Sequence, residues 1–99
     1  MATGNPYILG LAFEWDDAKA AANLAKHGVS FSYATRAFLD PYRLEEQDPE
    51  ERAGEIRYRL LGMAEERLLL VVYTYRRDTI RLISARRATH HEEAHYHAI

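Results

Sequence analysis

The sequence contains no cysteine, and this absence excludes several kinds of site at once. A chain without thiols forms no disulfide, binds no metal through thiolate and has no cysteine nucleophile. The composition therefore fits a reducing compartment, and any chemistry must come from other side chains.

The sequence also lacks a long hydrophobic run. The longest extends from Leu68 to Tyr73, far short of the roughly 20 residues that a membrane-spanning helix needs. Met1 to Gly10 lacks a basic region followed by a long apolar stretch, so we expect no signal peptide. We therefore expect a cytoplasmic protein.

Neither sign of charge is in large excess, since the net charge is -2 over 99 residues. The hydrophobic fraction of 47% and charged fraction of 28% are ordinary for a globular protein, and this length favours one domain. We expect residues 1–12 to form an irregular lead-in, with a short strand from Tyr7 to Phe13 as an alternative. Residues 13–99 are expected to form the single domain.

The small net charge hides a segregation along the chain. Glu45 to Glu55 contains six acidic residues and one Arg, whereas Ile56 to Arg87 contains eight Arg and three acidic residues, a net of +5. Guanidinium groups form planar forks that suit phosphate, so this stretch could bind a polyanion. The alternative is that the arginines serve solubility and salt bridges.

Two helices are predicted in the first half of the chain. The first begins at Asp16 or Asp17, which can cap it, contains helix-forming Ala and Leu, and ends at Gly28. The second is capped by Ser30 and runs from Phe31 to Leu39 with apolar residues at helical spacing.

The rest of the chain alternates as strands do and ends in a further helix. The expected strands run from Tyr42 to Glu46, Ile56 to Met63, Leu68 to Tyr75 and Thr79 to Ala85, and the helix from Thr89 to about Tyr96. This order predicts an α+β fold: two N-terminal helices, a small antiparallel sheet of about four strands, and a C-terminal helix.

The alternation places several arginines away from the apolar sides of their strands. Arg57, Arg59 and Arg81 are expected to share the sheet face that the helices leave open. With Tyr75 and Arg76 they would offer cations and a stacking ring to single-stranded RNA. Salt bridges to the acidic loop are the alternative.

Histidines near the C-terminus suggest a metal site, but the pattern is weak. His91 and His95 are four residues apart and would share a helical face, with His90 and His97 nearby. The HExxH order is absent and no further ligand is evident. We therefore expect no metal and no cofactor.

Several short stretches, in a fixed order and spacing, carry a family resemblance. They are Phe13-Glu14-Trp15-Asp16, Lys19, Asn23, Lys26-His27-Gly28-Val29-Ser30-Phe31, Ala34, Phe38, Asp40-Pro41, Gly54-Glu55-Ile56-Arg57, Leu61-Gly62, Val71-Val72-Tyr73-Thr74 and Arg81-Leu82-Ile83-Ser84-Ala85-Arg86-Arg87-Ala88. The chain resembles the BrnT toxins of type II toxin–antitoxin systems.

The resemblance implies a fold similar to RelE and an endoribonuclease that cleaves RNA and inhibits translation. It further implies a BrnA-type antitoxin with a ribbon-helix-helix region. The two would bind operator DNA together through the antitoxin and repress their own operon, with a dimer or heterotetramer as the assembly.

RNA can be cut without a metal if the 2′-OH attacks the adjacent phosphate, leaving a cyclic phosphate. The step needs proton transfer and cations around the phosphorane. His27 is the proton-transfer candidate and Lys26 its neighbour, although both could merely complement a helix dipole. The match to the Lys-His-Gly stretch favours catalysis. Arg86 and Arg87 are phosphate candidates, and Glu55 is a candidate base or orienter of an Arg.

Consecutive strand residues point to opposite faces, so Arg86 and Arg87 would share a site only if the chain has left the sheet there. We expect that it has, because Thr89 soon starts a helix whose N-terminus would also attract phosphate. The competing function is a non-catalytic or decayed module of the toxin fold, acting through antitoxin binding and operon autoregulation.

Overall fold

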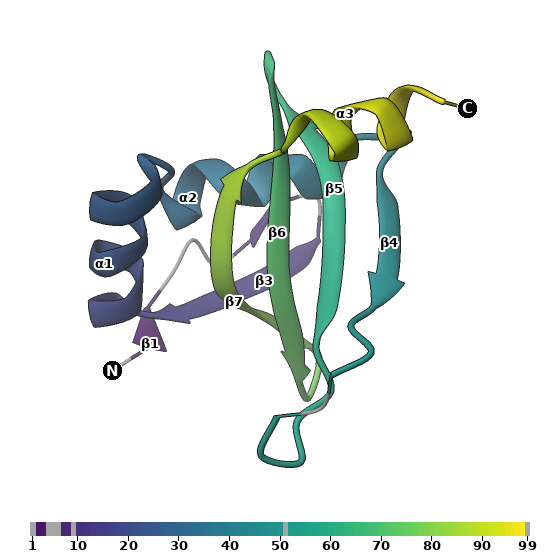
Figure 1. The fold of residues 1–99 in the computed structure, drawn as a ribbon. Coiled ribbons are helices and arrows are strands. Elements are labelled where there is room, and N and C mark those ends of the chain that lie inside the picture. The colour runs from purple at the N-terminus through teal and green to yellow at the C-terminus, as the bar shows by residue number, and fades with distance from the viewer. Residues whose placement is uncertain (1, 4–6, 9, 51, 99) are drawn as a thin grey trace.

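The computed structural model describes residues 2–3, 7–8, 10–50 and 52–98, with side chains from residue 10 onward. Its strands are β1 (Ala2–Thr3), β2 (Tyr7–Ile8), β3 (Leu11–Asp16), β4 (Leu44–Gln47), β5 (Tyr58–Ala64), β6 (Arg67–Arg76) and β7 (Thr79–Arg87). Its helices are α1 (Asp17–His27), α2 (Phe31–Ala34) and α3 (His90–His97), with the 3-10 helix η1 (Thr35–Leu39) after α2. The α+β class is confirmed (Figure 1).

The sheet is mixed, so the prediction of a purely antiparallel sheet is wrong. The longer strands lie in the order β3-β7-β6-β5-β4, and β3 runs parallel to β7 while the other pairs are antiparallel. The difference arises where the expected lead-in meets the domain, because Phe13 and Trp15 are buried in the core and Leu11–Asp16 forms a full strand. Within the lead-in, β1 and β2 also pair with β3.

The four expected later strands are present, with ends that differ from the expected ones by at most two residues. Alternate side chains of β5, β6 and β7 are buried against α2 and η1, among them Leu60, Val71, Tyr73 and Leu82. Phe38 of η1 lies between Tyr73 and Phe13, with ring centroids 5.1 Å apart in each pair. The core therefore lies between one sheet face and the α2–η1 segment.

The second helix is not one continuous α-helix. It begins at Phe31 with Ser30 as its cap, as predicted, but tightens into a 3-10 helix at Thr35. The Thr35 hydroxyl donates to the Ser32 carbonyl at 2.6 Å within this turn. Next to it, a Cβ on Gly62 of β5 would lie 2.6 Å from the Ala37 carbonyl oxygen, so the close approach of η1 to the sheet requires glycine there.

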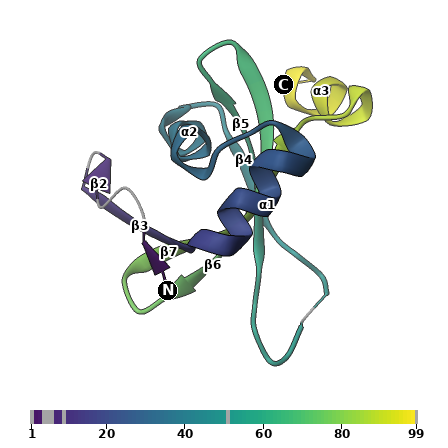
Figure 2. The ribbon, with the colours of Figure 1, turned by 90° about the vertical axis from the view of Figure 1, so that its left-hand side faces the viewer.

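α3 crosses the other face of the sheet, opposite α2 (Figure 2). No residue of α3 is buried, so polar contacts and not apolar packing hold this helix on the sheet. Burial alone would raise the pKa of Asp40, but hydrogen bonds from the Tyr96 hydroxyl of α3 and from the Met63 and Tyr42 amides lower this pKa overall. The sheet face beneath α3 is otherwise uncovered by helices, and we call it the open face.

Candidate active site

The last turn of α1 presents the predicted pair Lys26 and His27. The helix starts where the Asp16 carboxylate accepts the Lys19 amide at 3.0 Å, and it ends at Gly28, whose φ of 69° suits glycine. Lys26 is exposed and His27 is half-buried. The predicted helix bounds are confirmed, and they place both side chains at its C-terminal end.

Asn23 joins α1 to the end of β7. Its Nδ2 donates to the carbonyls of Val29 and Ala85, each at 2.9 Å, and its Oδ1 accepts the Ala85 amide at 3.1 Å. Lys26 and His27 lie one helical turn beyond Asn23. The ends of α1 and β7 therefore adjoin, and we call Lys26, His27 and Arg87 the α1–β7 corner.

β7 remains in the sheet through Arg87, so the expectation that the chain has left it there is wrong. Leu70 pairs with Arg86 and Leu69 with Arg87, and the two arginines point to opposite sides. The reason is that β6 is long enough to pair with β7 to its last residue. Only Arg86 lies on the open face.

Arg86 forms a two-pronged ion pair with Glu92 of α3, with nitrogen–oxygen distances of 2.8 and 3.0 Å. This contact raises the pKa of Arg86 and lowers the pKa of Glu92. Glu92 also accepts the Thr89 amide, and the Thr89 hydroxyl accepts the Glu92 amide, which forms a capping box. The N-terminus of α3 therefore already uses two of its donors internally.

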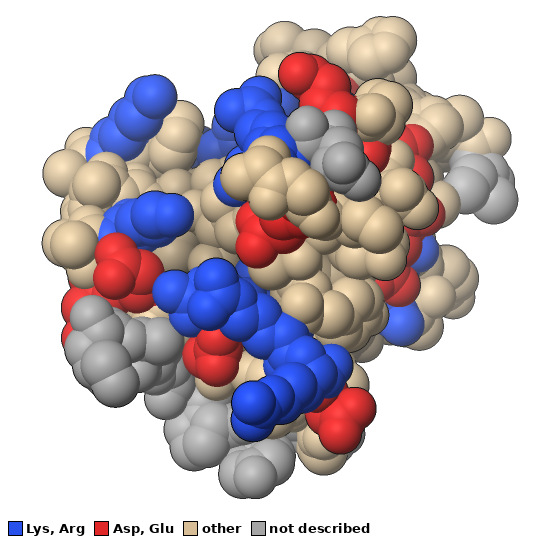
Figure 3. Space-filling model, turned by 90° about the horizontal axis from the view of Figure 1, so that it is seen from below, with Lys and Arg blue, Asp and Glu red and all other residues tan. Residues whose placement is uncertain are grey.

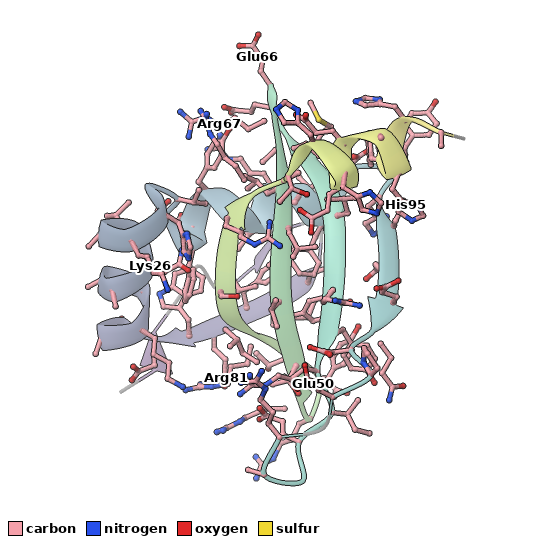
Figure 4. All side chains as sticks on the ribbon, in the orientation of Figure 1. Lys26, Glu50, Glu66, Arg67, Arg81 and His95 are labelled. Atoms are coloured by element: carbon pink, nitrogen blue, oxygen red, sulfur yellow. The ribbon has the colours of Figure 1, made fainter. Side chains whose placement is uncertain are left out.

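Arg87 borders a separate hollow of about 340 Å3 at the end of the sheet where β7 leads into α3, which we call the upper end. Its lining includes Glu66 of the β5–β6 turn, Arg67 at the start of β6 and His90 of α3. A neighbouring hollow, which Arg67 and Glu66 also line, reaches Gly28 and Ser30 at the α1–α2 connection. Figure 4 shows Arg67 and Glu66 at this end and Lys26 on α1. Two shallow spaces thus lie between the end of α1 and the start of α3.

The open face carries the other predicted arginines, and each of them is paired. Arg59 contacts Glu46, and Arg81 contacts Glu14 at 2.8 Å. Arg57 continues the alternation just before β5 and contacts Glu55 at 3.2 Å. The shared face is confirmed, and so are salt bridges from Arg57 and Arg59 to the acidic segment.

Glu55 does not lie at the α1–β7 corner. It belongs to the β4–β5 loop, which lies at the lower end of the sheet (Figure 1), and its carboxylate contacts Arg57 at 3.2 Å. Tyr75 is not on the open face either, because it pairs with Ile80 and packs against Tyr73 and Tyr58 on the core side. Its ring is half exposed, at 51%.

Six cations form no ion pair with another described residue. They are Lys19, Lys26, Arg67, Arg76, Arg77 and Arg87. Arg76 and Arg77 are at the β6–β7 turn. Seen from that end, Lys and Arg side chains form a diagonal band with acidic groups beside it (Figure 3). The cations that form no ion pair within the described part of the chain therefore concentrate at the two ends of the sheet.

The sequence reasoning missed three contributors to this arrangement. Asn23 and Glu92 fix the ends of α1 and β7, and His95 of α3 lines a hollow of about 260 Å3 with Arg59 and Glu92. A capping box at Thr89 could have pointed to Glu92. No local pattern reveals that Asn23 reaches a strand 62 residues away.

No group of three or more His, Asp or Glu side chains among the described residues could hold a metal ion. No described helix has the length and apolar character needed to cross a membrane. The site thus offers imidazole, ammonium, guanidinium and carboxylate groups.

A family model described as the ribonuclease toxin BrnT of type II toxin–antitoxin systems matches residues 15–92. The chain belongs to the BrnT family. Membership makes it a ribonuclease toxin with an RNA target and an antitoxin partner. A search of curated proteins found no match.

The BrnT match covers every candidate residue of the α1–β7 corner and the open face, and it ends at Glu92. His95 and Tyr96, which complete α3, lie beyond it. The part of this BrnT toxin that the family model describes therefore includes the Arg86–Glu92 pair but not the Tyr96–Asp40 anchor.

Proposed function

We propose that this toxin is a metal-independent endoribonuclease that cleaves RNA at the α1–β7 corner and thereby inhibits translation. The observation that carries the proposal is the junction of Asn23 with Ala85, which holds the last turn of α1 beside the end of β7. That junction supports the proposal because it joins the helix turn that carries the His27 imidazole and the Lys26 ammonium to the strand that carries the Arg87 guanidinium.

The reaction follows from these groups. The 2′-oxygen loses its proton and bonds to the adjacent phosphorus, the bond from phosphorus to the 5′-oxygen breaks, and that oxygen gains a proton. His27 carries proton transfer, because imidazole accepts and donates protons near neutral pH. Lys26 and Arg87 stabilise the charge that develops on the phosphorane, and Arg86, on the opposite side of β7, binds the RNA strand from the open face.

The remaining candidates bind the strand or support those that do. Arg57, Arg59 and Arg81 follow the RNA backbone along the open face, and Arg76 extends the cationic track at the lower end. Tyr75 offers its exposed edge to a base at that end. Glu55 orients Arg57, since their contact at 3.2 Å lies at the lower end of the sheet, away from the corner.

The test uses the purified toxin, separated from its antitoxin, with a defined RNA in EDTA. We expect cleavage that leaves cyclic phosphate and 5′-hydroxyl ends, and we expect His27→Ala to abolish most of it. Lys19→Ala is the matched control, because Lys19 is a cation near the start of α1 that forms no ion pair with another described residue. Loss of all cleavage in EDTA would contradict the metal-free reaction, and full activity of His27→Ala would remove His27 from the site.

A second candidate is a non-catalytic module that binds a BrnA-type ribbon-helix-helix antitoxin and regulates operator DNA with it. Its support is that all four arginines of the open face are already neutralised by Glu. Expression without antitoxin separates the two candidates. Growth arrest that His27→Ala relieves supports the enzyme, and no arrest with a folded protein supports the module.

A further inference from the structure

The upper half of β7 has an unusual neighbour. β3 pairs with β7 only from Thr79 to Arg81. Beyond Arg81, no described strand lies along this edge of β7. α1 lies along this side (Figure 2), and the Asn23 side chain bonds to both backbone groups of Ala85. A side chain thus occupies the place of an adjacent strand.

The chemistry of this contact calls for a carboxamide. One Nδ2 hydrogen goes to the Ala85 carbonyl and the other to the Val29 carbonyl, while Oδ1 accepts the Ala85 amide. Asn23 is 7% exposed, so these bonds are shielded from water. Aspartate cannot donate, and glutamine carries the same group one methylene further from the helix.

We propose that Asn23 is the positioning residue of the cleavage site, and that its carboxamide sets the separation between His27 and Arg87 at the end of β7. The inference rests on the proposed function. Because Asn23 ties α1 to the residue directly before Arg86, a shift of α1 moves His27 relative to the phosphate. Misplacement of about 1 Å costs on the order of 100-fold in rate.

The first measurement compares Asn23→Asp with the wild-type toxin under single-turnover conditions. We expect kcat to fall by about 10- to 100-fold while KM changes by less than about 3-fold, because positioning affects the transition state more than binding. Thr35→Val is the matched control, since it removes a buried side-chain bond to a backbone carbonyl away from α1. We expect Thr35→Val to lower Tm and leave kcat unchanged.

The second measurement is a double-mutant cycle with His27. If Asn23 acts by placing His27, Asn23→Asp lowers the residual activity of His27→Ala by less than about 3-fold. An equal loss in both backgrounds would overturn the proposal and leave Asn23 with a structural role only. Should Asn23→Asp fail to fold, Asn23→Gln replaces it in the same cycle. A smaller loss in the His27→Ala background then supports the positioning role, and an equal loss in both backgrounds overturns it.

The outcomes separate this inference from the proposed function. Full activity of His27→Ala contradicts the proposed function itself. A large effect of His27→Ala with an unchanged kcat in a folded Asn23 variant contradicts only the positioning role. Amide hydrogen exchange at Ala85 provides an independent check, because Asn23→Ala removes its acceptor and should speed exchange there.

Discussion

The α1–β7 corner and the open face of the sheet both carry cations, but they differ in what those cations contact. On the open face, Arg57, Arg59, Arg81 and Arg86 each meet a glutamate. At the corner, Lys26 and Arg87 form no ion pair with any described residue. A phosphate that reaches Lys26 or Arg87 has no ion pair with a described residue to break, whereas one on the open face must displace or tolerate a carboxylate.

This contrast changes the meaning of the arginine-rich segment. Eight arginines between Ile56 and Arg87 suggested one continuous cationic surface. The fold instead brings the acidic segment, as β4 and the loop after it, next to the same strands. Much of the charge that is separated along the chain is therefore paired in space.

The largest expected effect tests the corner directly. His27→Ala should lower kcat by about 100- to 10,000-fold, the range that general acid–base catalysis contributes. Single-turnover cleavage of a defined RNA measures the change, with Lys19→Ala as the control on the same helix. A loss below about 5-fold would remove the catalytic distinction between the corner and the open face.

The next prediction compares one arginine from each region. Arg87→Ala should lower kcat/KM by about 10- to 100-fold, because its guanidinium, which forms no ion pair among the residues that the structure describes, is available to stabilise phosphorane charge. Arg59→Ala should change it by less than about 5-fold, because Glu46 already neutralises Arg59. Equal losses from both variants would show that the glutamate pairs do not limit RNA binding.

Much of the fold was predictable because local signals were strong. Asp16, Gly28 and Ser30 marked helix ends that the structure confirms, and alternation located the later strands. The parallel pairing of β3 was not predictable. A short strand next to a helix cap does not reveal its partner, and Ile80, which lies opposite Phe13, is 67 residues further along the chain.

The candidate site was only partly predictable for the same physical reason. Residue type identified His27 and the arginines as able to do the chemistry, but ion pairing depends on which strands adjoin. The Arg81–Glu14 contact joins residues 67 positions apart. The separation of Arg86 from Arg87 required knowing how far β6 extends, which alternation alone does not give.

A smaller effect is expected where the two regions meet. Glu92→Gln should lower KM by about 2- to 5-fold, because it frees Arg86 for phosphate. It should also cost less than about 1 kcal/mol of stability, since the pair is partly exposed to solvent. KM measurements and thermal unfolding test both parts, and an unchanged KM would assign Arg86 to bracing α3.

The stability part of that effect depends on pH in a defined direction. Arg86 lowers the pKa of Glu92 below the ordinary value of 4.5, so the pair stabilises the fold above that pH. Its contribution is lost as pH falls through the lowered pKa. The Tm difference between wild-type and Glu92→Gln toxin should therefore be constant near neutral pH and shrink below about pH 4.5.

The smallest expected effect concerns the cationic band at the lower end. Arg76→Gln should raise KM by about 2- to 3-fold and reduce the salt dependence of RNA binding by a slope of about 0.7, the value for one phosphate contact on a single strand. Arg36→Gln removes the same charge from a side chain that Glu65 already pairs, so its slope should not change. Because both side chains are exposed, a difference between these variants would report ion pairing and not charge alone. Equal slopes would mean that only net charge attracts the strand at this distance from the corner.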